Sequence, residues 1–337
     1  MKNNKTYLLL LFIVVGLFYG CPSPYEYKPP PFPLIVSLWY NAVSNELYVL
    51  KGQRIEVFNN ASAANGQISP ARTISPPIIN SYSYMGYSNI WLDNASDQLY
   101  VVSPFLNCIL VFTDATSIDG NVTPARVISG TTELNHPVSL WLDSNTKQLY
   151  VLSSSNNDIL VFTDATTANG NVSPARIISG PATELNYPTS LWFDSNSDQL
   201  YVASGYSNIS ILVFTQASTM NGNVAPVKSI TSTLLYGTHS WLWLDSPSNE
   251  FYVICGYNGI GAFVFTDATT ANGNVVPTRQ ITATQAVGGI GGPIWVDSTS
   301  DQLYITHQGI KEPGSILVFD NASTINGNVT PSRVIYP

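Results

Sequence analysis

Apolar residues recur along this chain in short runs separated by polar turns, and the runs themselves repeat as a unit. The first run of each unit contains Trp followed two residues later by an acidic or amide residue, as in SLWLD at 139–143, and a polar turn leads to a second run, LYV or a close variant. A third run ends in Phe about ten residues later, and a fourth segment places a basic residue after Pro, as at 174–178. Short β-branched and aromatic runs bounded by Gly, Asn, Asp and Pro predict β-strands. We therefore expect four short strands in each unit.

The four-run unit occurs six times at a nearly constant spacing. Its most regular marker is the Trp of the first run, which recurs at intervals of 52, 50, 51, 51 and 52 residues. The six markers are Trp39, Trp91, Trp141, Trp192, Trp243 and Trp295. The Tyr of the second run is equally regular, at Tyr48, Tyr100, Tyr150, Tyr201, Tyr252 and Tyr304. A fixed period near 50 residues indicates a repeat array.

The apolar character of both alternating faces of these strands decides how the repeats pack. A sheet that is apolar on both faces must be covered on both, and in a radial array every blade packs between two others. A parallel β-helix would need much shorter rungs, and a helical solenoid would need a 3.6-residue period that the sequence lacks. The sequence therefore predicts an all-β domain at 34–337, a six-bladed β-propeller with four antiparallel strands per blade. The first repeat opens on an inner strand and the last ends on an outer strand, so we expect contiguous blades and closure by packing, without a shared strand.

The repeat also resembles a known family of propeller repeats. The unit ILVFTDATTANGNVSPARIISG at 159–180 is followed by P-x-S-L-W-x-D at 188–194 and QLYV at 199–202. It resembles the NHL and YVTN-type repeats of secreted bacterial proteins, and the resemblance covers 34–337. Kelch repeats have a similar period, but their glycine doublet is absent apart from 288–292. Such propellers serve as binding platforms and, in some relatives, as lactonases or lyases, so the resemblance implies the fold rather than the function.

The N-terminal residues predict that the protein is located in the cell envelope. Residues 1–20 carry two lysines followed by an apolar run too short to span a bilayer, which is the pattern of a signal peptide. The run ends in FYGC at 18–21, which resembles a bacterial lipobox and implies lipidation of Cys21; an ordinary secretory signal with an incidental cysteine is the alternative. Residues 21–33 form a Pro-rich tether. By resemblance to lipoproteins of diderm bacteria, Pro22 after the cysteine implies the outer membrane, on its periplasmic or surface side.

Composition and cysteine usage exclude several classes of protein. With 13 Lys and Arg against 21 Asp and Glu, the net charge is −8 and the pI about 4.7, so no basic surface is available and nucleic-acid binding is not expected. A chain that is 45% hydrophobic and 10% charged is not intrinsically disordered. Cys108 and Cys255 fall in the second and fifth repeats, on opposite sides of any ring, so we expect two free, packed thiols rather than a disulfide.

Three kinds of polar residue recur in every repeat, and we assign each a structural role. The residue two positions after each Trp is expected to accept turn amides in an Asx-turn rather than to form a ring of metal ligands. These residues are Asn41, Asp93, Asp143, Asp194, Asp245 and Asp297. After the third strand, a polar side chain is expected to cap one helical turn that a following Asn-Gly pair reverses. The basic residue of the fourth strand is expected to pair with carboxylates of that loop.

Function is expected at the opposite end of the blades, where the loops differ between repeats. The loops between the second and third strands share this variable face with the loops that connect successive blades, and binding usually resides on loops held by a rigid scaffold. Tyr is frequent in these loops, and it offers a large apolar face and a hydroxyl at low entropic cost. The predicted ligand-binding residues are Tyr84, Tyr87, His136, Tyr187, Tyr206, Tyr236, His239, Tyr257 and His307.

Three classes of function remain open at this point. The leading hypothesis is a monomeric, lipid-anchored extracytoplasmic propeller that binds a protein or a glycan on its variable face, without a cofactor or catalytic residues. A metal-assisted lactonase or lyase with its site at the propeller mouth is the alternative that the resemblance supplies. The three histidines lack the local spacing of a zinc site, and no nucleophile elbow, P-loop or dinucleotide motif occurs in the sequence. A structural surface protein without a selective ligand is the third class.

Overall fold

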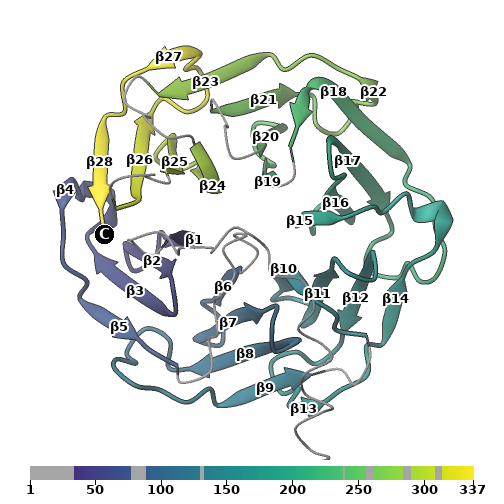
Figure 1. Ribbon diagram of the computed structural model, residues 1–337, viewed down its shortest axis with the longest axis horizontal. Helices are drawn as coiled ribbons and strands as arrows, with labels where there is room; N and C mark the ends of the chain where they lie inside the picture. Colours follow the sequence, from purple (N-terminus) through teal and green to yellow (C-terminus); the bar gives the residue numbers. More distant parts are fainter. Residues whose placement is uncertain are drawn as a thin grey trace, which may run out of the picture. The chain divides into compact units, whose positions relative to one another are not determined.

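Six antiparallel sheets surround a common axis and confirm the predicted six-bladed propeller (Figure 1). The computed structural model describes residues 34–76, 89–129, 133–237, 240–255, 261–283, 290–307 and 313–337. All the described residues belong to one compact unit, Phe32–Pro337.

Each blade has four antiparallel strands in chain order, from an inner strand at the axis to an outer strand at the rim. Blade one comprises β1 (Ile35–Asn41), β2 (Glu46–Lys51), β3 (Arg54–Asn59) and β5 (Arg72–Ile74). Blade two comprises β6 (Ile90–Asp93), β7 (Gln98–Ser103), β8 (Cys108–Thr113) and β9 (Arg126–Ser129). Blade three comprises β10 (Pro137–Asp143), β11 (Gln148–Ser153), β12 (Asp158–Phe162) and β14 (Arg176–Ile178). Blade four comprises β15 (Pro188–Asp194), β16 (Gln199–Ser204), β17 (Asn208–Thr215) and β18 (Lys228–Tyr236). Blade five comprises β19 (Ser240–Asp245), β20 (Glu250–Cys255), β21 (Ala262–Thr266) and β23 (Arg279–Ala283). Blade six comprises β24 (Ile290–Asp297), β25 (Gln302–His307), β26 (Ser315–Asp320) and β28 (Arg333–Tyr336).

The core lies between the blades, as the two-sided apolar pattern predicted. In β11, Leu149 packs in the cluster shared with blade two, whereas Tyr150, the next residue, packs in the cluster shared with blade four. Each pair of neighbouring blades shares one such cluster, including blades six and one. The repeat Tyr and Phe residues are among the largest fully buried side chains, and burying one aromatic side chain contributes roughly 1.5–3 kcal/mol. The residues that recur in every repeat therefore form the same interface between each pair of neighbouring blades.

Neighbouring blades are also joined through their backbones. A short strand in the loop after the third strand of one blade pairs in parallel with the outer strand of the preceding blade. These short strands are β4 (Gly66–Gln67), β13 (Gly170–Asn171), β22 (Gly273–Asn274) and β27 (Gly327–Val329). At the remaining two joints a single bridge replaces the short strand, Ile74 with Gly120 and Ile178 with Gly222.

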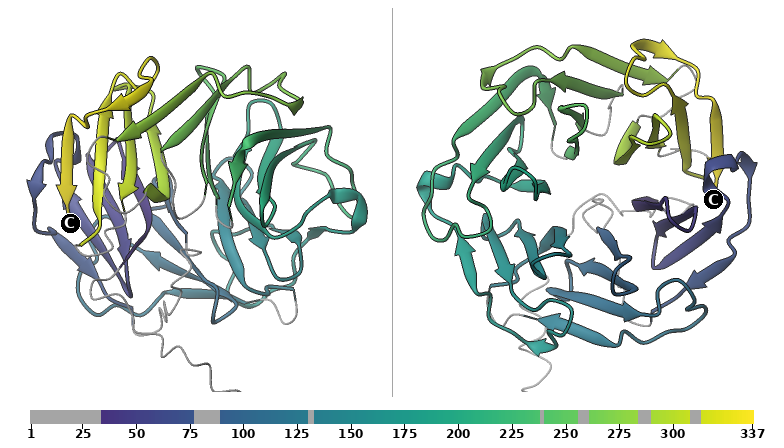
Figure 2. Two further views of the ribbon diagram at one scale, coloured as in Figure 1. Left: turned by 45° about the horizontal axis from the view of Figure 1, so that its top comes forward. Right: turned by 180° about the vertical axis from the view of Figure 1, so that it is seen from behind.

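The same joint closes the ring. β4 of blade one pairs with β28 of blade six, with Gly66 opposite Ile335 and Gln67 opposite Tyr336, and Figures 1 and 2 show the two segments side by side. The expectation that packing alone closes the ring is therefore wrong. Blade six has four strands of its own, and β4 is added to its outer edge. Backbone pairing caps the edge strand, which would otherwise present unpaired groups to solvent.

The Asn-Gly pairs explain why every joint looks alike. The glycines have φ between 71° and 81°, a left-handed conformation that Gly adopts without steric cost. The residue before each Gly accepts, through its side-chain Oδ1, the backbone N–H of the preceding blade's outer strand, at 2.7–3.1 Å. The donor and acceptor pairs are Thr73 with Asp119, Val127 with Asn169, Ile177 with Asn221, Ser229 with Asn272, Gln280 with Asn326 and Val334 with Asn65. The predicted turn is thus also an inter-blade clamp.

The basic residue of the outer strand reaches across the same joint. Arg176 donates from Nη1 to the carbonyl oxygens of Ala217 and Met220 in blade four, at 2.9 and 2.7 Å. The equivalent arginines that make two such carbonyl contacts are Arg72, Arg126, Arg279 and Arg333. Lys228, in the same place, donates to the carbonyl oxygen of Thr269. The guanidinium groups therefore satisfy the carbonyl oxygens at the end of the next blade's helical turn.

The expected pairing of these basic residues with loop carboxylates is wrong. Within the described residues, two of the arginines meet a carboxylate, and each carboxylate begins the second strand of the same blade. The two pairs are Arg72 with Glu46 at 2.8 Å and Arg279 with Glu250 at 2.5 Å. In blades two, three and six a Gln occupies the same place and accepts from the guanidinium.

The residue before the helical turn does not act as the expected cap in blade one. Asn60 precedes the 3-10 helix η1 (Ala61–Ala63) without a side-chain capping bond, and its φ of 54° is left-handed. The equivalent residues in the other blades have φ between 53° and 59°. Asn and Asp tolerate this conformation better than most residues. The side-chain cap comes instead from the turn between the first two strands, as where Asp198 accepts both the backbone N–H and the hydroxyl of Ser218 at 2.8 Å.

The described helices are short and the described cysteines are unpaired. The second 3-10 helix, η2, covers Pro181–Thr183, and no helix within the described ranges is long and apolar enough to cross a membrane. Cys108 and Cys255 are free and buried, as predicted. Burial raises the pKa of the Cys108 thiol to about 11 and that of Cys255 to about 12. Both thiols therefore stay protonated at neutral pH.

Candidate functional site

The six marker tryptophans meet on the axis of the propeller. Each lies in the innermost strand of its blade, and neighbouring indole centroids are 4.0–4.4 Å apart around a closed circle. Interplanar angles of 54–68° tilt each indole against the next, in the edge-to-face range that aromatic pairs prefer. Trp295 of blade six contacts Trp39 of blade one, so the circle is complete across the closure. The Trp ring divides the two ends of the central channel.

Five of the six residues two positions after each Trp accept a turn amide, as predicted for an Asx-turn. The exception is Asp245, whose carboxylate accepts hydroxyls of Ser248 and Ser298 among the described residues, because Pro247 has no N–H to donate. Asp194 accepts the backbone N–H of Asn196 at 3.2 Å and the hydroxyl of Ser197 at 2.6 Å, the pattern of an Asx-turn. Asp93, Asp143 and Asp297 make the same kind of contacts in their own blades. No group of three or more His, Cys, Asp or Glu side chains in the described part of the chain could hold a metal ion.

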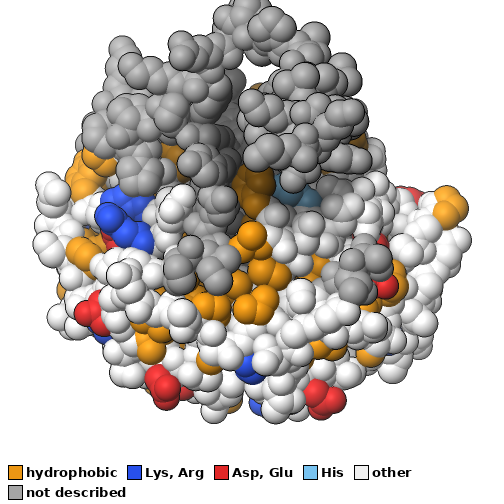
Figure 3. Space-filling view, turned by 60° about the horizontal axis from the view of Figure 1, so that its bottom comes forward, with side chains coloured by type: hydrophobic (Ala, Val, Ile, Leu, Met, Phe, Trp, Pro, Cys, Tyr) orange, Lys and Arg blue, Asp and Glu red, His pale blue; other side chains and the backbone are white. Residues whose placement is uncertain are grey.

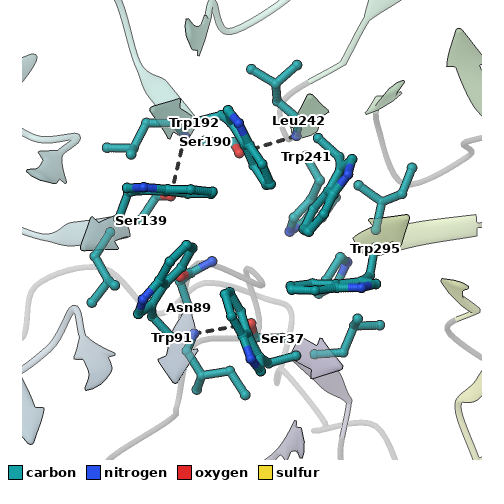
Figure 4. Close-up of a pocket in the computed structure, with 18 residues that line it drawn as sticks. Ser37, Asn89, Trp91, Ser139, Ser190, Trp192, Trp241, Leu242 and Trp295 are labelled. Atoms are coloured by element: carbon teal, nitrogen blue, oxygen red, sulfur yellow. Dashed lines mark hydrogen bonds between the residues drawn. The ribbon is translucent and has the colours of Figure 1, made fainter. Parts of the chain in front are cut away.

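On the other side of the Trp ring, toward the variable face, lies an axial funnel. Its wall consists of the residues two positions before each Trp, which share a strand face with it. These wall residues are Ser37, Asn89, Ser139, Ser190, Trp241 and Pro293. Figure 4 shows the indoles of the Trp ring arranged around one centre, with the labelled serine side chains directed toward it. The sequence analysis missed this funnel, although the S-L-W motif and its variant WLW at 241–243 were visible signals.

The serines of the funnel wall hold neighbouring blades together. Ser37 Oγ accepts the backbone N–H of Ile90 in blade two, at 3.2 Å. Ser139 Oγ accepts the N–H of Leu191 at 3.4 Å, and Ser190 Oγ accepts the N–H of Leu242 at 3.2 Å. All three side chains are at most 7% exposed. Within the described residues their hydroxyls accept these bonds and donate none.

The funnel is small and uncharged. Its volume is about 50 Å³, which is room for roughly three to five atoms of the size of a water molecule. Its described lining residues are Ser, Asn, Leu, Ile, Trp and Pro, and none of these side chains is ionisable. Trp241 departs from the Ser of the other repeats and adds a seventh indole to the lining. The arrangement can receive a compact neutral group that carries hydrogen-bond acceptors.

On the variable face, blades two to four carry exposed aromatic side chains. Tyr187, before β15, and Tyr206, in the loop between β16 and β17, are each 57% exposed and their ring centroids are 5.5 Å apart. Tyr236, at the end of β18, is 59% exposed and pairs in register with Asn208. Phe105 of blade two is 51% exposed and lies edge-on to His136, with centroids 6.2 Å apart. We refer to these five residues as the aromatic arc.

The backbone fixes the positions of two members of the arc. His136 and Tyr187 occupy equivalent positions before their inner strands, and both have left-handed backbones, with φ of 55° and 48°. Each donates its backbone N–H to an Asn side chain of the preceding blade, His136 to Asn107 at 2.8 Å and Tyr187 to Asn157 at 2.7 Å. Burial lowers the pKa of His136, which favours its neutral form.

Acidic and basic side chains are scattered in small groups on the side of the molecule that Figure 3 presents.

The predicted binding residues have different locations in the structure. His136, Tyr187, Tyr206 and Tyr236 belong to the aromatic arc. His307 is 5% exposed at the end of β25, with Nδ1 3.4 Å from Ser315 Oγ, so its side chain is buried. The remaining predicted residues, Cys21, Tyr84, Tyr87, His239 and Tyr257, lie outside the described residues. Phe105 is the member of the arc that the sequence analysis did not select.

A buried carboxyl lies beneath the variable face. Asp158, at the start of β12, is 6% exposed, and its Oδ1 has no hydrogen-bond partner among the described residues. Burial raises the pKa of Asp158 to about 6, the charge of Glu133 raises it further, and hydrogen bonds from Ser153 and Asn156 oppose the change. The carboxyl therefore titrates close to neutral pH.

Known proteins share little detectable sequence with this chain. No protein-family model matches it, and no curated protein matches it. Among solved structures, Kuenenia stuttgartiensis hydrazine synthase is similar, with a TM-score of 0.47 and 13% identity. The match covers 68% of this chain and 62% of the hydrazine synthase chain, which is less than two thirds of its length. A likeness at this level carries no argument about function.

Proposed function

We propose that this chain is a lipid-anchored extracytoplasmic propeller that binds a protein or a glycan on its variable face. The observation that supports binding is the aromatic arc, in which Tyr187, Tyr206 and Tyr236 are all more than half exposed. Large exposed aromatic side chains held on a rigid scaffold are typical of recognition surfaces. The lipid anchor rests on the sequence around Cys21.

The chemistry of this face favours a glycan. The aromatic arc contains no acidic or basic side chain apart from His136, whose pKa is lowered. Tyr rings pack against the apolar faces of sugar rings, while their hydroxyls hydrogen-bond to sugar hydroxyl groups. The side chains of Asn107 and Asn157 hold the backbones of His136 and Tyr187, so these two members of the arc are positioned before any ligand arrives. A preformed surface avoids part of the entropic cost of binding.

Titration of the purified full-length chain in detergent with a panel of neutral oligosaccharides tests this proposal. Replacing Tyr187 and Tyr206 together by Ala should weaken binding of the recognised oligosaccharide at least tenfold, because both aromatic rings of this pair are lost. The matched control is Tyr336→Ala, which removes a Tyr that is 41% exposed on the outer strand of blade six. Unchanged binding by the double variant would contradict the assignment of this face, and absence of binding to any oligosaccharide would contradict the glycan ligand.

A further inference from the structure

The axial funnel presents hydrogen-bond donors that the protein does not use. The hydroxyl oxygens of Ser37, Ser139 and Ser190 each accept one inter-blade amide, which orients each oxygen and leaves its hydrogen to donate elsewhere. No acceptor for these hydrogens is found among the described residues. Buried polar groups are normally satisfied, so donors that converge on a cavity indicate an occupant that brings acceptors.

The described lining of the funnel carries no charge, and this favours a neutral group as the occupant. None of the described lining residues is ionisable, and transfer of an unpaired charge into such a site is costly. The indoles of the lining attract a cation through their faces, but an ammonium group would find no carboxylate among the described lining residues, and the serine hydroxyls offer it hydrogens rather than acceptors. A carboxylate group would find donors but no counter-charge. A neutral carbonyl oxygen satisfies the donors without this cost.

The volume of the funnel and the Trp ring at its floor further limit which neutral groups can bind there. A volume of about 50 Å³ admits roughly three to five non-hydrogen atoms. The floor is the Trp ring and part of the wall is Trp241, so an apolar end of the occupant is buried on indole surface. Asn89 supplies a side-chain carboxamide on the same wall, and its oxygen can accept a hydrogen bond from an N–H donor.

We propose that the axial funnel receives the acetamido group of an N-acetylated sugar. The four non-hydrogen atoms of this group fit the volume. Its carbonyl oxygen accepts from the hydroxyls of Ser139 and Ser190, which lie in neighbouring blades, its N–H donates to Asn89, and its methyl group packs on the Trp ring. The inference rests on the proposed glycan-binding function and specifies the ligand for the same face. The aromatic arc then contacts the rest of the oligosaccharide, outside the funnel.

Three oligosaccharides that differ at one substituent separate this inference from general glycan binding. The full-length chain is titrated with β-1,4-linked trimers of N-acetylglucosamine, of glucosamine and of glucose, with tryptophan fluorescence and calorimetry as readouts. We expect the acetylated trimer to bind at least tenfold more tightly than the other two and to change the tryptophan emission, because its methyl group reaches the indoles. The glucosamine trimer should bind most weakly at pH values where its amines are charged.

Two sets of variants locate the site. Ser139→Ala with Ser190→Ala should remove the preference for the acetylated trimer while leaving the weaker binding of the glucose trimer unchanged. The matched control is Ser96→Ala with Ser197→Ala, which removes two hydroxyls from turns at the opposite end of the blades. Trp241→Ser places in blade five the residue that blades one, three and four already carry, so the variant is expected to fold, and it should reduce the preference by widening the funnel.

The outcomes distinguish this inference from the function on which it rests. Equal affinity for the acetylated and glucose trimers would overturn the acetamido site and leave glycan binding by the aromatic arc intact. Retention of the preference in both the serine double variant and Trp241→Ser would also overturn it, because the preference would then arise elsewhere. Failure of all three trimers to bind would overturn the acetamido site, and failure of the wider panel of neutral oligosaccharides as well would overturn the glycan function.

Discussion

The backbone N–H of Val334, in the last strand of the propeller, donates to Asn65 Oδ1 in the first blade at a distance of 3.1 Å. This contact repeats, at the closure of the ring, the contact that joins every other pair of blades. The five other joints connect blades that follow one another in the chain, so their partners stay close even when the joint opens. The joint between Val334 and Asn65 has no such tether, because 269 residues separate the two.

Replacing Asn65 by Ala should therefore open the closure more than the same change opens an internal joint. Loss of one such hydrogen bond costs about 0.5–1.5 kcal/mol, and we expect this loss for both Asn65→Ala and Asn169→Ala in urea unfolding. The difference should lie in local opening, measured by hydrogen exchange of the amides of β28. Their protection should fall in Asn65→Ala and stay near that of the wild type in Asn169→Ala. Equal exchange in the two variants would show that the closure is no weaker than the internal joints.

The cost of losing an outer-strand arginine should depend on its partner on the second strand. Arg279 meets the carboxylate of Glu250, whereas Arg176 meets the neutral side chain of Gln148. Removing one partner of a buried ion pair leaves an uncompensated charge, at a cost of about 3–5 kcal/mol. Arg279→Ala should accordingly lower the free energy of unfolding more than Arg176→Ala, which loses carbonyl contacts and a hydrogen bond to a neutral side chain but leaves no unpaired charge.

A double variant checks the cause of this difference. Glu250→Gln in the Arg279→Ala background removes the unpaired charge and should recover part of the lost stability, measured by urea or thermal unfolding. If Arg279→Ala and Arg176→Ala are equally destabilised, or if Glu250→Gln recovers nothing, the carbonyl contacts rather than the ion pair dominate at this joint.

The fold and the binding site differ in how far the sequence predicts them. The spacing from Trp39 to Trp295 predicts six blades, because the period, the strand composition and two-sided burial all point to one architecture. The partner of Asn169 could not be predicted, since Val127 lies 42 residues earlier in another blade and no local pattern links the two. The sequence placed Tyr187 correctly on a loop, but its exposure depends on the left-handed backbone that Asn157 stabilises.

The burial of His307 could not be predicted from the sequence for the same reason, because it depends on how the strands are paired. Strand register places it opposite Ser315 at the end of a hairpin, in the position that Ser153 and Ser204 occupy in blades three and four. The serines there hydrogen-bond to the loop before the inner strand, which shows that the position is structural. A histidine in a variable segment resembles a binding residue in the sequence, and its burial becomes evident only when the register is known.

Asp158 should make the stability of the propeller dependent on pH. Its pKa in the folded protein is raised from 3.8 to about 6, so the native state binds this proton more tightly than the unfolded chain does. The contribution is intact below about pH 4 and is lost as pH rises through 6, at a cost on the order of 2–3 kcal/mol. Asp158→Asn should therefore be more stable than the wild type at pH 8 and equal to it near pH 4, by urea unfolding at both values.

The control for this effect is an exposed aspartate of the same blade. Asp164 is exposed and has a left-handed backbone that Asn also tolerates. Asp164→Asn makes the same chemical change at an exposed position, and its unfolding free energy is measured at the same two pH values. A pH dependence of Asp158→Asn no larger than that of Asp164→Asn would contradict the raised pKa of the buried carboxyl.

The proposed anchor predicts that Cys21→Ser abolishes lipid attachment. Acylation needs the thiol, and each buried methylene of an acyl chain contributes about 0.8 kcal/mol to membrane binding. The variant should move from the detergent phase to the aqueous phase on phase separation, and mass spectrometry of the N-terminal peptide should find no added acyl mass. Cys108→Ser is the matched control, since that thiol is buried in the propeller and should not affect partitioning. Partitioning of Cys21→Ser with the wild type would contradict the lipobox interpretation.

Deletion of one complete repeat tests whether six blades are required for a closed ring. A deletion from Gly120 to Asn169 removes one period and rejoins the chain within equivalent loops. It removes β9 to β12, so that β14 becomes the outer strand of the blade formed by β6, β7 and β8. Every remaining joint keeps its Asn-Gly or Asp-Gly clamp and its outer-strand basic residue, so no local interaction explains a loss of stability.

The tryptophans, however, contact their neighbours, with ring centroids 4.0–4.4 Å apart around a circle of six. Five indoles would fill a smaller circle only if every interface between blades opened at a wider angle, and close-packed interfaces resist such changes. We therefore expect the five-repeat chain to aggregate or to expose the cluster that blades six and one share, with loss of protection in β4 and β28. A monomeric five-repeat chain that unfolds in one cooperative transition would show that the interfaces, rather than the Trp ring, determine the number of blades.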